Sequence, residues 1–305
     1  MTFRLTILGC GSATPMFGRN PTAQVLNVHE RFFLVDCGEG TQVQLWQNRV
    51  KYQRINHIFI SHLHGDHYLG LMGLISSMNL NGRKTAMNVY CFQPLEEIIN
   101  MQLKYSGTVL KFDLRFHHLK PDVREVIYDE DEVSVSTIPL RHRIPCSGFL
   151  FAEKSRPLNI NKERLVALNI PFQLINSIKE GADYIAPDGK VIKNEELTYE
   201  AAPPRSYAFC SDTIFEENIV EQIKGVNLLY HEATFLHEME IRAAETFHTT
   251  ALQAAMIAKQ AEVKQLLIGH FSSRYKDTQP LLDEARQVFD NTLMAYDGMV
   301  VEIED

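Results

Sequence analysis

The sequence lacks the features that mark membrane, secreted and disulfide-rich proteins. It has no apolar run long enough to span a bilayer, and its first residues lack the basic region, apolar stretch and cleavage site of a signal peptide. Its five cysteines are an odd number, lie far apart and include no Cys-x-x-Cys pair. We therefore expect buried free thiols in a cytoplasmic protein with no membrane partner.

Positive charge is also scarce. The chain has 30 Lys and Arg residues against 38 Asp and Glu residues, a formal net charge of -8. Nonspecific binding to nucleic acid draws on an excess of basic side chains, so this composition excludes a chain that coats DNA or RNA with its whole surface. We expect no DNA partner, while a local basic track remains compatible with the composition.

The 305 residues, 45% of them hydrophobic, suffice for a single large domain. Short apolar runs punctuated by Gly, Pro and Asn alternate with helical patterns at both ends of the chain, which indicates an α/β fold over residues 1–305. The predicted strands are 3–8, 23–28, 32–36, 57–61, 87–92, 132–139, 207–211, 226–231 and 265–270. The predicted helices are 68–79, 95–105, 250–260 and 279–289.

Residues 151–205 differ from both flanks. They contain Pro157, Pro171, the turn signal 187–189 (PDG) and alternating charge, with little continuous hydrophobicity. This composition predicts an inserted arm, with some helix at 162–168. An ordinary irregular surface excursion is the alternative.

Four potential metal ligands fall within six residues, where a predicted strand gives way to a helix. In an extended loop His62 and His64 point the same way and can reach one ion, whereas Asp66 and His67 follow the turn at Gly65 and suit a second. Imidazole nitrogens and carboxylate oxygens are zinc ligands, and such a cluster is costly to bury uncoordinated. The run predicts a two-metal hydrolase.

Further candidate ligands stand where strands end. His142, Asp212 and His270 each follow a strand-like run, and the carboxyl ends of strands in layered α/β proteins converge on one crevice. Each residue taken singly has a structural alternative, and His142, between two arginines, is also explained by a basic surface.

Six motifs spread over the whole chain resemble the ribonuclease Z family, tRNA 3′-processing endonucleases of the metallo-β-lactamase superfamily. They are residues 8–15 (LGCGSATP), 36–42 (DCGEGTQ), 62–67 (HLHGDH), 231–235 (HEATF), 248–250 (HTT) and 269–275 (GHFSSRY). The resemblance implies an αββα sandwich of two mixed sheets flanked by helices, two zinc ions per chain and cleavage of the 3′ trailer from precursor tRNA, leaving a 3′-hydroxyl on the tRNA.

Carried over by position, the resemblance implies the metal ligands. One zinc is held by His62, His64 and His142, the other by Asp66, His67 and His270, with Asp212 as the bridge. The chemistry of the residues led to the same set.

The resemblance also assigns catalytic roles. Asp66 takes a proton from the attacking water, His248 protonates the leaving oxygen, and Glu232 orients His248. Helix capping is the alternative for Glu232. Arg274, just past a ligand, suits a substrate phosphate, with a structural salt bridge as its alternative.

In this family an inserted arm binds the elbow of the tRNA. Residues 151–205 occupy the position of that arm, so the resemblance implies that they form an RNA-binding exosite. Lys179 resembles a residue of the segment after the arm tip, although the tip itself lacks the usual Gly-Pro. Arg19 lies in the loop that approaches the acceptor end, where Phe17 stands in place of a lysine found in many relatives. The family also implies a homodimer.

Two rival functions remain at this stage. A small-molecule phosphodiesterase of the same superfamily needs no arm, and a noncatalytic RNA-binding subunit needs no metal. The filled ligand positions disfavour the second rival.

Overall fold

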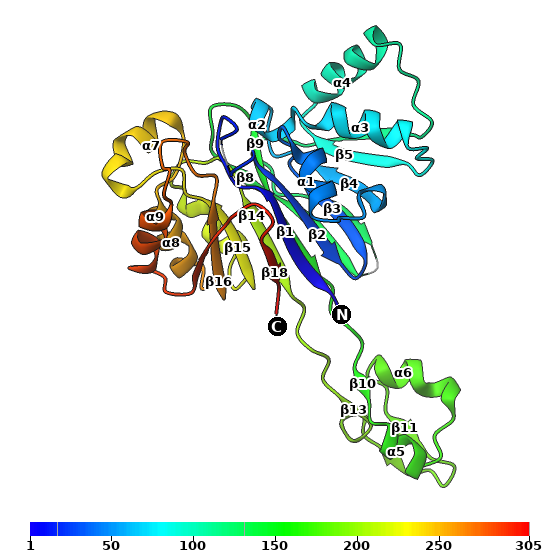
Figure 1. Ribbon diagram of the computed structural model, residues 1–305. Helices are drawn as coiled ribbons and strands as arrows, with labels where there is room; N and C mark the ends of the chain where they lie inside the picture. Colours follow the sequence, from blue (N-terminus) through cyan, green and yellow to red (C-terminus); the bar gives the residue numbers. More distant parts are fainter. Residues whose placement is uncertain (17, 131, 305) are drawn as a thin grey trace. The chain divides into compact units, whose positions relative to one another are not determined.

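The structure is a computed structural model that describes residues 1–16, 18–130 and 132–304, so the predicted contribution of Phe17 lies outside the described residues. The chain divides into two compact units, the first made of Met1–Ala152 with Arg205–Glu304 and the second of Glu153–Pro204 (Figure 1). No helix within the described ranges has the length and apolar character needed to cross a membrane.

In the described residues, the first unit contains two seven-stranded sheets. One sheet has the strand order β18 (Val300–Glu302), β1 (Phe3–Gly9), β2 (Ala23–Val28), β3 (Arg31–Val35), β4 (Ile55–Phe59), β5 (Met87–Cys91), β6 (Leu114–His118). The other has the order β17 (Thr292–Met294), β16 (Gln265–Gly269), β15 (Leu228–Glu232), β14 (Ser206–Cys210), β9 (Cys146–Glu153), β8 (Val133–Leu140), β7 (Val126–Glu130). Both sheets mix parallel and antiparallel pairs.

The main core lies between the two sheets. Aromatic rings from both meet there: the ring centres of Phe33 and Phe151 are 5.6 Å apart, and those of Phe59 and Phe149 are 5.4 Å apart. All four side chains are fully buried. Aromatic pairs at this spacing add to the free energy gained by burying apolar area, so these contacts hold the sheets face to face.

Helices cover the outer faces. On the first sheet α1 (Thr41–Gln47), α3 (Leu71–Leu80) and α4 (Pro94–Tyr105) bury leucines and isoleucines against the strands. On the second sheet α8 (Ala251–Gln260) and α9 (Gln279–Arg286) do the same. The short helices α2 (Gly65–Tyr68) and α7 (Glu240–Thr246) lie at the same end of the two sheets (Figure 1). The predicted αββα architecture is confirmed.

The second unit has a small core of its own. Helices α5 (Lys162–Ala167) and α6 (Ile175–Lys179) pack with two short antiparallel strand pairs, β10 (Asn159–Ile160) with β13 (Thr198–Tyr199) and β11 (Tyr184–Ile185) with β12 (Val191–Ile192). The buried residues are Leu165, Ile178, Tyr184, Ile192 and Leu197.

Every predicted strand overlaps an observed one, but β6, β7, β9, β17 and β18 of the first unit and the two-residue strands β10 to β13 of the second were missed. Strand β9 runs through Phe151 and Ala152, which the sequence had assigned to the arm. Phe151 is fully buried between the sheets, so this stretch belongs to the core of the first unit.

Candidate metal centre and catalytic site

The ligand loop, which we define as residues 62–67, follows β4 and runs into the first residues of α2, and two glycines allow other backbone to pack tightly around it. A Cβ atom on Gly38 would lie 2.4 Å from the carbonyl oxygen of Asp66, and one on Gly70 would lie 2.1 Å from the carbonyl oxygen of Gly38. Only glycine fits at these distances. The loop that carries the ligands is thereby fixed against the segment after β3.

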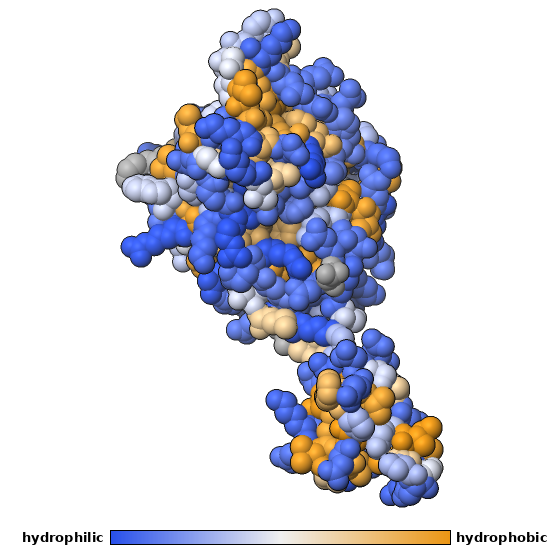
Figure 2. Space-filling model, turned by 90° about the vertical axis from the view of Figure 1, so that its right-hand side faces the viewer, coloured by the Kyte–Doolittle hydropathy of each residue, from blue (hydrophilic) through white to orange (hydrophobic). Residues whose placement is uncertain are grey.

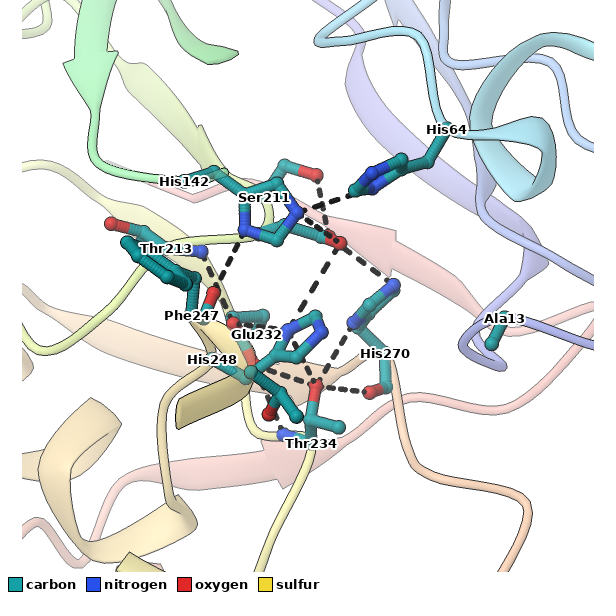
Figure 3. A network of polar contacts seen from close by, with 12 residues as sticks. Ala13, His64, His142, Ser211, Thr213, Glu232, Thr234, Phe247, His248 and His270 are labelled. Carbon is teal, nitrogen blue, oxygen red and sulfur yellow. Dashed lines mark hydrogen bonds and ion pairs between the residues drawn. The ribbon is translucent and has the colours of Figure 1, made fainter. Parts of the chain in front are cut away.

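Four side chains form a first donor group. The Nε2 atom of His62 lies 3.1 Å from Nδ1 of His64. The Nε2 atom of His142 lies at the same distance from that nitrogen (Figure 3). The Oδ2 atom of Asp212 lies 3.5 Å from Nε2 of His62 and 3.8 Å from Nε2 of His142. His142 follows β8 and Asp212 follows β14, so the second sheet meets the ligand loop of the first. Three imidazoles and a carboxylate suit zinc.

A second donor group surrounds the other oxygen of Asp212. Its Oδ1 atom lies 3.3 Å from Nε2 of His67 and 3.2 Å from Nε2 of His270. Both Nε2 atoms also lie 3.5 Å from Oδ2 of Asp66. Asp212 therefore presents one oxygen to each group, which is the arrangement of a carboxylate that bridges two ions.

Two buried nitrogen atoms indicate whether the residues of this site fit a bound metal ion. Nε2 of His67 and Nε2 of His270 make no hydrogen bond within the part of the chain that the structure describes. A buried polar atom without a partner costs about 1–3 kcal/mol. A metal ion among these atoms would satisfy both nitrogens, since neutral imidazole is a common metal ligand. The residues present thus fit a bound metal.

The second ring nitrogen of each of these histidines is held in place. Nδ1 of His67 lies 2.7 Å from Oδ2 of Asp36, a fully buried carboxylate that also accepts the Ser61 amide at 2.8 Å. Nδ1 of His270 lies 3.0 Å from the hydroxyl oxygen of Thr234. Such contacts orient a ligand ring and select the tautomer that leaves Nε2 available.

The electrostatics of the site favour a cation. Burial lowers the pKa of His62, His64 and His142, which keeps these rings in the neutral form that binds metal. Burial acts in the same direction on His67, but the surrounding carboxylates, led by Asp212, raise its pKa well above the ordinary value. The carboxylates of the second donor group thus favour a positive charge at this position, which is either a proton on His67 or a metal ion.

His248 and Glu232 lie beside the donor groups. Nδ1 of His248 is 2.9 Å from Oε1 of Glu232, the last residue of β15, whose two oxygens also accept the amides of Thr213 and Thr234 at 3.1 Å. Burial would lower the pKa of His248, but the charge and hydrogen bond of Glu232 raise it to about 9. A pKa of about 9 favours the protonated imidazole at neutral pH, so His248 can act as a proton donor beside the two donor groups.

A cleft of about 470 Å³ opens over both donor groups. Its walls include His64, Asp66, His142, Asp212, His248 and His270. Five of the seven expected ligands and His248 thus line one cavity, while His62 and His67 are fully buried among them. Glu232 is buried and contacts His248.

The three expected substrate-binding residues have separate surroundings. Arg274 is exposed, and its guanidinium lies 5.0 Å from the ring centre of Phe235. Arg19 donates a hydrogen bond to the carbonyl oxygen of Tyr275, which ties its loop to the segment after β16. Lys179 ends α6 in the second unit.

Sequence reasoning assigned no role to Asp36, Thr234 or Ala13. The structure shows that Asp36 and Thr234 hold ligand rings, and that the Ala13 amide donates to Oδ2 of Asp66 at 2.7 Å. All three lie inside motifs that the resemblance singled out. A motif shows that positions matter together, but it does not show which atom touches which ligand.

Comparisons with known proteins agree with this geometry. The ribonuclease Z of Phocaeicola vulgatus is 50% identical over 302 residues, covering 99% of this chain and 98% of that protein. The structure of human tRNase Z, short form, is similar with a TM-score of 0.73 and 27% identity, covering 99% of this chain and 100% of that one. The metallo-β-lactamase fold protein YhfI from Bacillus subtilis shares the fold, with a TM-score of 0.70, 17% identity and coverage of 99% and 100%. The chain therefore has the metallo-β-lactamase fold and belongs to the ribonuclease Z family, and its residues 3–185 also belong to the family described as Anti-Pycsar protein Apyc1.

Proposed function

We propose that this protein is a zinc-dependent endoribonuclease that removes the 3′ trailer from precursor tRNA and leaves a 3′-hydroxyl on the tRNA. The observation that carries the proposal is the position of Asp212, whose Oδ2 atom faces one histidine group and whose Oδ1 atom faces the other. Membership of the ribonuclease Z family supplies the substrate class.

Two zinc ions per chain are part of the proposal. One would be held by His62, His64 and His142, the other by Asp66, His67 and His270, with Asp212 shared between them. When bound, two zinc ions supply positive charge that lowers the pKa of a water molecule and stabilises the oxygens of a phosphoryl displacement.

The chain's own residues move the protons. As water oxygen forms its bond to phosphorus, the Asp66 carboxylate, oriented by the Ala13 amide, takes a proton from that water. The bond from phosphorus to the 3′-oxygen of the tRNA breaks, and His248 gives its proton to that oxygen. Glu232 keeps His248 protonated and correctly turned, since its charge raises the pKa of the imidazole.

The second unit is proposed as the RNA-binding arm. A groove of about 840 Å³ on this unit is lined by apolar side chains that include Leu165 and Phe172, with Lys162 and Lys179 among them. Phe172 is 74% exposed, and Figure 2 shows apolar residues over much of the visible face of this unit. Apolar and aromatic surface beside lysines suits RNA, because bases stack on it while the lysines contact phosphate. Lys179 would make such a contact.

Three further features belong to the proposal. A homodimer is proposed from the family resemblance, and the cytoplasm as the location and the absence of a DNA partner are proposed from the composition. Arg274 and Arg19 are proposed to meet the acceptor end of the RNA, with Arg19 acting through the loop that it ties down.

The experiment that tests the proposed function compares metal-loaded and metal-free protein on a 3′-extended precursor tRNA. Cleavage that disappears on chelation and returns with two equivalents of zinc is the expected result. Cleavage that survives complete removal of metal, or purified protein that binds well under two ions without loss of activity, would contradict the proposal.

A further inference from the structure

Two arginines line the cleft without a role in the proposed chemistry. Arg143 follows the ligand His142 directly, and Arg242 lies on α7, which leads to His248. A guanidinium presents a planar fork of donors that matches the oxygens of a phosphate. The cleft therefore contains phosphate-binding groups beyond its metal ligands.

Both arginine side chains contact Glu245, and the neighbouring Thr246 also lines the cleft. Nη2 of Arg143 donates to the main-chain oxygen of Glu245 at 3.2 Å, a contact that leaves the charge of Arg143 unneutralised. Nη1 of Arg242 lies 3.3 Å from the Glu245 carboxylate, in a pair with both side chains more than half exposed. Exposed ion pairs are weak, so a substrate phosphate can replace the carboxylate at small cost. Thr246, one helical turn after Arg242, lines the cleft from the same helix face.

The arginine pair belongs to the same side of the cleft as the proton donor. Arg242 and His248 come from one continuous segment, and the carbonyl oxygen of Phe247 between them lies 2.9 Å from Nδ1 of His142. Ala13 lies across the cluster from Phe247 (Figure 3). We call the cleft residues Arg143, Arg242, Thr246 and His248 the His248 wall.

The opposite side has different chemistry. Its cleft residues Ala13, Pro15 and Glu39 come from loops of the first sheet and Asp66 from helix α2, and we call these four residues the Asp66 wall. Glu39 is exposed there and adds a carboxylate, which disfavours a close phosphate. The cleft thus has a polarity, with arginines on one wall and an acidic group on the other.

We propose that Arg143 and Arg242 bind the phosphates of the tRNA acceptor strand on the 5′ side of the cut bond, so that the trailer lies along the Asp66 wall. The inference rests on the proposed function, in which His248 protonates the leaving 3′-oxygen. That oxygen belongs to the last nucleotide of the tRNA, so this nucleotide must lie against the His248 wall. The phosphate before it then meets the arginines.

Precursor tRNAs with one neutral methylphosphonate test this polarity. In one RNA the phosphate before the last tRNA nucleotide is neutralised, and in the other the first phosphate within the trailer. With wild-type protein, the tRNA-side methylphosphonate should raise the protein concentration that gives half the maximal single-turnover rate. The expected increase is about three- to fivefold per lost arginine contact. The double variant Arg143→Ala, Arg242→Ala should show the same increase on the unmodified RNA and no further increase with the tRNA-side methylphosphonate.

Salt dependence gives a second, independent readout. Loss of both arginines leaves the tRNA-side phosphate without its neutralising partners, which should reduce the slope of log affinity against log salt by about 0.7, the contribution of one neutralised phosphate on a single strand. The variant Arg143→Lys, Arg242→Lys should restore the slope because it restores the charge. Arg115→Ala is the matched control, because Arg115 is an exposed arginine on β6 that also pairs with a carboxylate, that of Asp113.

Three results would overturn the inference. In the first, the double alanine variant stays as sensitive to the tRNA-side methylphosphonate as wild type; in the second, it loses its sensitivity to the trailer-side one instead. If wild type still cuts the unmodified precursor, either result contradicts the proposed placement of the tRNA side and the trailer side in the cleft. The proposed function is then unaffected. If wild-type protein does not cut the unmodified precursor, the proposed function fails and the inference falls with it.

Discussion

Nδ1 of His248 lies 2.9 Å from Oε1 of Glu232, a side chain with no exposed surface. This pairing fixes which ring nitrogen of His248 faces the carboxylate and leaves the other nitrogen for a substrate oxygen. It also joins the end of strand β15 to the segment after α7, so the proton donor is positioned by the sheet itself. Two predictions follow from this pair of residues.

Replacing His248 removes the proton donor without removing a proposed metal ligand. General acid catalysis contributes about 100- to 10,000-fold, so His248→Ala should slow single-turnover cleavage of precursor tRNA by that factor. Zinc content, measured by elemental analysis on the same sample, should stay at the wild-type value. If bound zinc fell in step with activity, His248 would be acting through the metal rather than as the donor.

Glu232 sets the pH range over which His248 is protonated. Because the folded protein raises the pKa of His248 to about 9, the donor is available below that pH and is lost as pH rises through it. In Glu232→Gln the carboxylate charge is gone, and burial then lowers the imidazole pKa toward or below its ordinary value of about 6.5. The alkaline limb of the pH–rate profile should move to lower pH by about as many pH units as the pKa of His248 falls. An unmoved limb would show that another group limits the rate.

Asp36 orients His67 from behind, so its charge should matter for metal affinity. Asp36→Asn keeps the shape of the side chain but weakens the hydrogen bond to Nδ1 of His67. Contacts of this type contribute about 10- to 100-fold to metal affinity, and chelator competition should show a loss in that range. Asp113→Asn, at an exposed carboxylate just before the edge strand β6, is the control. Equal affinities in the two variants would contradict the role of Asp36.

Gly38 leaves no room for a side chain under the ligand loop. An added Cβ would lie 2.4 Å from the carbonyl oxygen of Asp66 and 2.6 Å from Cβ of Pro21, so Gly38→Ala must displace backbone. Such overpacking costs about 1–3 kcal/mol, and the displaced loop should also bind zinc more weakly. Gly73→Ala, which meets only the flexible end of Gln42 at 3.4 Å, should keep both the Tm and the zinc affinity. A Gly38→Ala protein with unchanged zinc affinity would show that the loop position is not held there.

The second unit should be needed for RNA and dispensable for chemistry. Deletion of residues 155–200, joined by a short linker, removes nearly all of that unit and none of the described metal ligands. Cleavage of precursor tRNA should be lost, while hydrolysis of a chromogenic phosphodiester should persist. The Tm of the deletion protein checks that the first unit folds. Equal loss of both activities in a folded protein would contradict the role of the arm.

The proximity of the candidate ligands was predictable from the sequence because many of them are local. His62, His64, Asp66 and His67 occupy one loop, and their spacing alone separates the two donor groups seen in the structure. His142, Asp212 and His270 were predictable for a different reason, since each follows a strand and strand ends converge in α/β folds.

Other parts of the site left no trace in the residue pattern. The contact of Ala13 with Asp66 is made by a main-chain amide, so side-chain chemistry does not report it. Arg242 is one charged residue on a helix surface until the fold turns that surface toward the cleft. The edge strand β6 was missed because Leu114–His118 is short and carries an arginine and two histidines, a composition that does not alternate cleanly.

The most direct test of the central claim is to map the ends of the products from a defined 3′-extended precursor tRNA cut by the zinc-loaded protein. The account predicts a single cut immediately after the last nucleotide of the tRNA body, with a 3′-hydroxyl on the tRNA and a 5′-phosphate on the trailer. A 3′-phosphate on the tRNA, or cuts scattered along the trailer, would contradict it.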